Sequence, residues 1–145
     1  MNLEKLTHAH GGSHQELWEI KSCFEQLAGE LTAHMKKEEI HLFPQIKKLV
    51  QAQQHNQELS PPPFGSIQNP IDAMEADHEG AGEVLTRIRS LSDDFTVPAD
   101  GCMTYQVTME RLLHFEEDLH QHIHLENNIL FPSAIKLERE RFASK

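Results

Sequence analysis

Residues 34–44 read HMKKEEIHLFP, and residues 122–132 read HIHLENNILFP. The second stretch repeats the histidine, glutamate, phenylalanine and proline of the first at a constant offset of 88 residues. Side chains four residues apart lie on one face of a helix, so each histidine can converge on the same point as its glutamate. The repeat therefore predicts two helices that carry the same polar pair at equivalent heights. Because each proline follows its glutamate by six residues, we expect each helix to end or kink there.

Helical spacing extends outward from both stretches. Apolar residues recur every three or four positions over residues 13–50, 71–91 and 103–130, as on helices that face a bundle core. Residues 51–70, which are rich in proline and glutamine, and residues 92–101 interrupt this spacing and are predicted to be loops. The polar residues at core positions of the three stripes are His34, Glu38, His78, His122 and Glu126.

These elements predict an all-α, up-down helical bundle in a single domain that covers residues 1–145. The bundle would contain three long helices and a short C-terminal helix at residues 132–141. A helix of that length rises only about 15 Å, which is too short to match its neighbours. One long helix of a four-helix bundle is then missing, and we expect it to be absent or supplied by a second chain.

The composition restricts the function classes. The chain has 145 residues, with 13 Lys and Arg against 23 Asp and Glu, and a formal net charge of −10. This balance argues against a general nucleic-acid or anionic-membrane binder. No apolar run approaches the roughly 18 residues of a membrane span, and the start lacks the apolar region of a signal peptide. Cys23 and Cys102 form neither a CxxC pair nor a dense disulfide pattern. The sequence thus predicts a cytoplasmic protein without nucleic-acid or membrane partners.

Glutamates at core positions need a positive partner, because burying an unpaired carboxylate costs several kcal/mol. Two carboxylates from facing helices can bridge a pair of metal ions, with histidines completing each coordination shell. Imidazole and carboxylate ligands without thiolate favour iron or manganese over structural zinc. The alternative is a buried His-carboxylate salt bridge that specifies the bundle. The histidines outside the stripes are expected to face solvent, namely His41, His55, His114, His120 and His124.

Two further motifs extend the pattern, HAHGGSHQEL at residues 8–17 and MEADHEGAG at residues 74–82. With the repeated stretches, they resemble the hemerythrin-like domain of the iron-sulfur cluster repair di-iron proteins, the repair-of-iron-centres family, over essentially the whole chain. The resemblance implies a four-helix bundle with two iron ions, for which manganese or zinc could substitute. It also implies a role in restoring iron-sulfur clusters damaged by nitric oxide or peroxide. The implied terminal ligands are His10, His34, His78 and His122, and the implied bridging ligands are Glu38 and Glu126.

The sequence departs from the family pattern at its start. We expect the family's N-terminal module with a cysteine pair to be absent, together with the first bundle helix and its further histidine ligand, so that one iron would lack a ligand. A homodimer, a substitute such as His8 or His14, or extra water would complete the site. We expect the homodimer, because a three-helix remnant would expose an apolar seam. Glu30 and Asp77 would either relay iron or orient a ligand histidine, or be ordinary surface acids.

Several functions share this ligand set. An iron donor in cluster repair predicts labile iron that passes to damaged iron-sulfur proteins. A gas carrier or sensor predicts reversible adducts of nitric oxide or dioxygen. A di-iron oxidase or peroxidase would need a substrate pocket, and a metal-depleted or zinc-bound bundle would serve interactions alone. We expect the iron donor, acting in nitrosative or oxidative stress, with gas binding and the metal-depleted bundle as alternatives. The sequence does not decide whether the chain is an enzyme.

Overall fold

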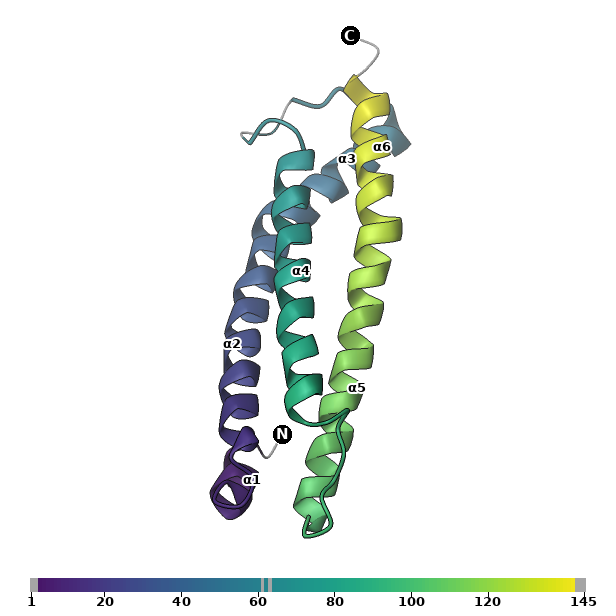
Figure 1. The fold of residues 1–145 in the computed structure, drawn as a ribbon. Helices are drawn as coiled ribbons and strands as arrows, with labels where there is room; N and C mark the ends of the chain where they lie inside the picture. Colours follow the sequence, from purple (N-terminus) through teal and green to yellow (C-terminus); the bar gives the residue numbers. More distant parts are fainter. Residues whose placement is uncertain (1–2, 61, 63, 143–145) are drawn as a thin grey trace. The chain divides into compact units, whose positions relative to one another are not determined.

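The computed structural model describes residues 3–60, 62 and 64–142. Within these ranges, the regular secondary structure is entirely helical (Figure 1). Along the same ranges, no helix combines the length and the apolar character that crossing a membrane requires. The predicted domain and loop also include residues outside the described ranges, namely 1–2, 61, 63 and 143–145.

Two long helices dominate the chain. The helical segments, in chain order, are α1 (Leu3–His10), α2 (Glu16–Lys37), η1 (Glu38–Leu42), α3 (Phe43–His55), α4 (Gln68–Leu91), α5 (Met103–Leu125), η2 (Glu126–Leu130) and α6 (Phe131–Phe142). Segments α2, η1 and α3 follow one another without a break as one 40-residue helix, and α5, η2 and α6 form a second. The η segments are π-helical turns, with hydrogen bonds that span five residues. The described residues therefore hold four helices, of which α1 and α4 are the other two.

The prediction of three long helices with a short C-terminal helix is wrong. Neither proline of the repeat ends its helix, because the first long helix runs to His55 and the second to Phe142. A π turn directly precedes each Phe-Pro pair, and the N–H of Phe43 bonds to the carbonyl of Glu38. After the π turn, the α-helical hydrogen-bond pattern starts again, and Pro44 lies in the first turn of α3. A residue in a first turn needs no N–H for the helix, so the proline is tolerated there. The short helix expected at 132–141 is part of the second long helix. Because the described residues form four helices, the expectation that one bundle helix is missing is also wrong.

Contacts along the chain divide it into two compact units. Unit 1 comprises residues 1–30 and 80–121, and unit 2 comprises residues 31–79 and 122–145, each with the exceptions given above. Each unit has a hydrophobic core of its own. The core of unit 1 consists of Leu3, Leu6, Leu17, Ile20, Cys23, Ile88, Phe95, Tyr105, Met109 and Leu112. The core of unit 2 consists of Leu42, Leu49, Ile67, Ile71, Met74, Phe131 and Ala134.

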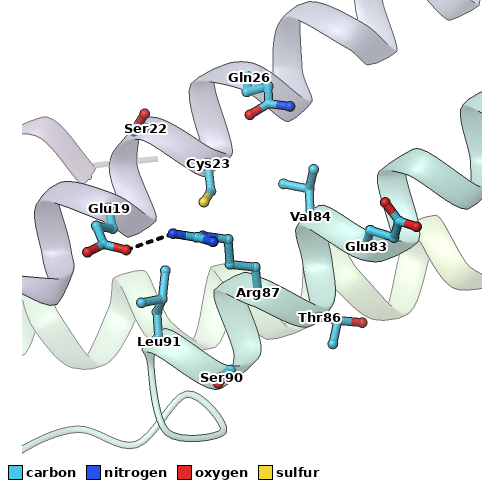
Figure 2. A pocket seen from close by; sticks show the side chains of 10 residues that line it. All are labelled: Glu19, Ser22, Cys23, Gln26, Glu83, Val84, Thr86, Arg87, Ser90 and Leu91. Atoms are coloured by element: carbon cyan, nitrogen blue, oxygen red, sulfur yellow. Dashed lines mark hydrogen bonds and ion pairs between the residues drawn. The ribbon is translucent and has the colours of Figure 1, made fainter.

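A surface pocket of about 830 Å³ lies in unit 1 along α2 and α4 (Figure 2). An ion pair of 3.0 Å between Arg87 Nη2 and Glu19 Oε2 joins the two helices there. Cys23 is part of the lining, and only 8% of its surface is exposed. No histidine lines this pocket, so the predicted metal ligands must be sought elsewhere.

Candidate metal centre

Four of the predicted ligands come together in unit 2. Each offers one ligand atom, and these atoms all lie within 4.8 Å of one another. All four side chains are buried, with 2–5% of their surface exposed. We call them the buried cluster, which consists of His34, Glu38, His78 and Glu126.

The two glutamates of the buried cluster occupy equivalent positions, each at the start of a π turn. The last turn of α2 carries His34, and Glu38 follows as the first residue of η1. Glu126 has the corresponding place at the start of η2, while His78 lies in α4. The π turns thus begin at the two glutamates, and π turns inside α-helices occur frequently at functional sites. The His78 ring also stacks on Phe131 of the unit 2 core, with ring centroids 5.8 Å apart.

Short contacts hold the buried cluster together. The Nε2 atom of His34 is 2.8 Å from Glu38 Oε1 and 3.9 Å from Glu126 Oε1. The Nε2 atom of His78 is 2.9 Å from the same Glu126 oxygen. His122, which was also predicted to be a ligand, brings its Nε2 atom to 3.0 Å from that oxygen, although half of its side chain is exposed. Glu126 is therefore the residue at which three imidazoles meet.

The opposite ring nitrogens of the two buried histidines have partners of their own. The Nδ1 atom of His34 is 3.1 Å from Asp77 Oδ2, and the Nδ1 atom of His78 is 2.9 Å from Asn127 Oδ1. Each Nδ1–H donates to its oxygen, so Nε2 is the atom left to face the cluster. Asp77 thus orients His34, whereas Glu30 is exposed and accepts a hydrogen bond from the Gln26 amide.

Asn127 contacts the candidate ligand His78, and the sequence analysis did not single it out. The sequence offered one indication of this contact, because Asn127 directly follows the predicted ligand Glu126. Replacing Asn127 by alanine is expected to weaken metal binding by about 10- to 100-fold, because His78 loses the acceptor that fixes its ring and tautomer. The check is a competition titration with Mn²⁺ on the metal-free chain. Asn128→Ala is the matched control, since Asn128 is exposed and bonds to His124 instead. Equal affinities in the two variants would contradict the orienting role.

The charges of the buried cluster depend on one another. Burial alone lowers the pKa of His34, but the nearby carboxylates of Glu126, Glu38 and Asp77 outweigh it and raise the pKa to about 10. Burial raises the pKa of Glu38, and Glu126 adds to the effect, although His34 opposes it. Burial also acts to raise the pKa of Glu126, yet the imidazoles of His34 and His78 outweigh it and lower that pKa. Without metal, a protonated His34 thus serves as the cation of the cluster.

Buried polar atoms without hydrogen bonds indicate that a metal ion would satisfy the buried cluster better than the proton on His34 does. Among the described residues, four buried side-chain atoms make no hydrogen bond: Gln45 Nε2, His78 Nε2 and both carboxylate oxygens of Glu126, although Glu126 Oε1 lies within ion-pair distance of two imidazoles. Three of these four belong to the buried cluster, and buried polar atoms without partners are costly. A metal ion takes up the lone pairs of imidazole and carboxylate ligands together. The residues present therefore fit a metal ion.

Metal binding is expected to strengthen as the pH rises. In the metal-free chain, the pKa of His34 is raised to about 10, so below that pH a metal must displace a proton from Nε2. One displaced proton makes the apparent affinity rise about tenfold per pH unit, and the rise should level off above the pKa. Mn²⁺ titrations at pH 7, 8 and 9, with the released protons counted, check this slope. Asp77→Asn should lower the pKa of His34 and flatten the slope, whereas an affinity independent of pH would contradict the assignment.

The remaining predicted ligand lies in unit 1. His10 ends α1, and its Nε2 atom is 3.2 Å from Cys102 Sγ. It also contacts the ring of Tyr105, with centroids 5.5 Å apart. The resemblance alone implied that His10 binds iron, and this stays a prediction. The five histidines expected to face solvent are all exposed, namely His41, His55, His114, His120 and His124.

Comparison with known proteins bears on this geometry. Residues 1–134 match the Hemerythrin HHE cation binding domain. The chain is 34% identical over 132 residues to a probable iron-sulfur cluster repair protein of Haemophilus influenzae, covering 91% of this chain and 53% of that protein. It is 40% identical over 106 residues to the iron-sulfur cluster repair protein YtfE of Enterobacter sp., covering 73% and 42%. It is 30% identical over 129 residues to the iron-sulfur cluster repair protein ScdA of Staphylococcus haemolyticus, covering 88% and 53%.

The chain thus spans about half the length of the curated relatives it matches. The resemblance predicted from the sequence motifs is confirmed, because the family match extends over most of the chain and the relatives bear the expected names. This chain belongs to the hemerythrin HHE cation-binding domain family, and its buried His/Glu cluster could hold a metal ion.

Proposed function

We propose that this chain is a non-haem di-iron protein of the iron-sulfur cluster repair type, which holds iron and supplies it in the cytoplasm during nitrosative or oxidative stress. The observation that carries the proposal is the buried cluster, in which both Glu126 oxygens and the Nε2 atom of His78 have no hydrogen bond. The names of the relatives support it, because they are iron-sulfur cluster repair proteins.

The buried cluster divides the work of holding iron among its residues. Glu38 and Glu126 would bridge, and His34 and His78 would act as terminal ligands whose orientation is set by their Nδ1 hydrogen bonds. Nitrogen and oxygen donors without thiolate suit iron or manganese. Iron, when bound, would supply Lewis-acid chemistry and a change of oxidation state.

Supplying iron also requires a path by which iron leaves the buried cluster, and the position of His122 supports such a path. Its side chain is half exposed while its Nε2 atom lies 3.0 Å from Glu126. A ligand with this exposure can turn toward solvent without disturbing the core, so iron could leave on that side. The net charge of −10 favours the approach of cations over anions.

The experiment is a transfer of labelled iron. The chain is loaded with ⁵⁷Fe²⁺ without oxygen, its iron content per chain is measured, and it is mixed with a dehydratase whose [4Fe–4S] cluster nitric oxide has damaged. The proposal expects about two irons per chain, with label appearing in the dehydratase as its activity returns. Glu39→Gln is the matched control, because Glu39 is exposed beside the ligand Glu38. Nitric oxide or dioxygen adducts that form without loss of iron would favour the gas-binding alternative and contradict iron supply.

A homodimer is the expected assembly. Unit 2 exposes five large apolar side chains, and their exposed fractions are 52% for Met35, 65% for Ile40, 39% for Phe43, 46% for Leu125 and 56% for Ile129. A second copy of the chain would cover such side chains and remove their apolar surface from water. Light scattering on a size-exclusion column should give twice the chain mass, and Ile40→Lys should shift the mass toward the monomer. A compact monomer of the unaltered chain at micromolar concentration would contradict the dimer.

A further inference from the structure

A second group of metal-ligating side chains lies in unit 1, outside the buried cluster, and includes His10, which the resemblance implied to be an iron ligand. Two pairs make it up. One pair is His10 with Cys102, at 3.2 Å between Nε2 and Sγ. The other is His14 with Asp100, whose two carboxylate oxygens lie 2.8 and 3.0 Å from Nε2. We call this group the unit 1 cluster, which consists of His10, His14, Asp100 and Cys102.

Local structure brings the two pairs to one place. The two histidines flank the turn that follows α1, and both rings contact Tyr105, with centroids 5.5 and 5.8 Å from its ring. The turn requires Gly11, because a Cβ there would clash with the Thr7 carbonyl oxygen. The acid and the thiol stand on either side of Gly101, just before α5 begins. The two histidine rings are 6.4 Å apart, centre to centre.

We infer that the unit 1 cluster is a second metal site, which takes a single Zn²⁺ ion and is independent of the proposed function of the buried cluster. The donor set is one thiolate, two imidazoles and one carboxylate, which are the ligand types of tetrahedral zinc. Sulfur is the donor that distinguishes it from the buried cluster, because thiolate selects zinc over iron or manganese held by oxygen and nitrogen.

Charge and distance both support this inference. A thiolate and a carboxylate together carry two negative charges, which one divalent ion balances. From the usual zinc–ligand distances, two ligands of one tetrahedral ion lie about 3.3 to 3.6 Å apart. The separations within the two pairs, 3.2 Å and 2.8 Å, are already close to that range. For one ion to bind all four side chains, the two half-buried histidine rings must move closer than the 6.4 Å between their centres.

The metal-free contacts also prepare the anionic forms. The backbone N–H of Tyr105 and then His10 lower the pKa of the Cys102 thiol, and His14 lowers the pKa of Asp100. Cys102 is exposed, so an ion can reach it directly. These are favourable conditions for a thiolate ligand.

The experiment uses Co²⁺ as a spectroscopic probe on the full chain. Cobalt bound to a thiolate gives a sulfur-to-metal charge-transfer band, which the buried cluster cannot give because it contains no sulfur. In the Glu126→Gln variant, whose buried cluster is disabled, we expect the band to saturate at one Co²⁺ per chain and to disappear when Zn²⁺ displaces the cobalt. Cys102→Ser should abolish it. His14→Gln and Asp100→Asn should each weaken the binding by at least about tenfold, in line with losses of 10- to 100-fold for changes around a metal site.

Two controls make the result decisive. Cys23→Ala removes the other cysteine, which is buried in the unit 1 core, and should keep the band. Glu126→Gln disables the buried cluster and should also keep it, so failure of either proposal can be told from failure of the other. The inference is overturned if the unaltered chain gives no band, if Cys23→Ala removes it, or if the band survives both His14→Gln and Asp100→Asn unchanged. Helix content measured by circular dichroism establishes that each variant is folded.

Discussion

Replacing Glu126 by glutamine is expected to lower the affinity for Fe²⁺ by at least about 100-fold, more than the 10- to 100-fold typical of changes to residues behind the ligands. The physical reason is the position of this carboxylate. The Nε2 atoms of His78 and His122 lie 2.9 and 3.0 Å from its Oε1 atom, and neither of its oxygens has a hydrogen-bond partner. An amide of the same size keeps the packing but offers one neutral oxygen in place of a charge.

The measurement is the iron content and affinity of the variant under anaerobic conditions. Glu117→Gln is the matched control, because Glu117 lies on the same long helix and is exposed. Glu38→Ala should also lower the iron content, since it removes the second predicted bridge. Retention of full iron stoichiometry by both Glu126→Gln and Glu38→Ala would show that iron is held elsewhere. Circular dichroism must show unchanged helix content, because the substituted positions are buried.

The spacing of apolar residues was sufficient to predict most of the buried cluster. On the first two stripes, His34, Glu38 and His78 are as deeply buried as the leucines and isoleucines around them. The reason is geometric, because a polar residue at a core position follows the same helical period as its apolar neighbours. Any argument based on that period needs the helix to keep a constant number of residues per turn.

The third stripe shows where that condition fails. Ile129 continues the apolar spacing that predicted a core-facing helix over residues 103–130, yet it is 56% exposed. It lies three residues after Glu126 inside η2, and in a π turn the wider spacing carries a residue three positions on away from the starting face. In the first long helix, Leu42 lies four residues after Glu38 and stays fully buried. A local change in hydrogen-bond register has no signature in apolar spacing. The same π turns let both helices continue past prolines at which each helix was expected to end or kink.

Side-chain pairs between distant segments could not be predicted from the apolar spacing either. Glu116 lies off the predicted stripe, yet only 4% of its surface is exposed, because Arg89 of α4 pairs with it. Asn127 contacts His78 across 49 positions of sequence. Such pairs depend on which helix faces which, and a single stripe does not contain that information.

Replacing Phe131 by alanine is expected to destabilise the metal-free chain by about 3–5 kcal/mol, the usual cost of truncating a fully buried phenylalanine. Phe131 is 0% exposed in the unit 2 core and stacks on the His78 ring at 5.8 Å. Its loss leaves a cavity and frees a predicted ligand, so metal affinity should fall along with stability. Urea unfolding of the metal-free chain measures the first effect, and a Mn²⁺ titration measures the second.

The repeat supplies the control for this prediction. Phe43 corresponds to Phe131 in the two Phe-Pro pairs, but 39% of its surface is exposed. The two phenylalanines have the same position in the sequence repeat, but in the structure Phe131 is buried and Phe43 is partly exposed. Phe43→Ala should therefore cost much less, because hydrophobic stabilisation scales with the apolar area removed from water. Equal losses of unfolding free energy in the two variants would mean that the repeat, and not the burial, determines what each phenylalanine contributes.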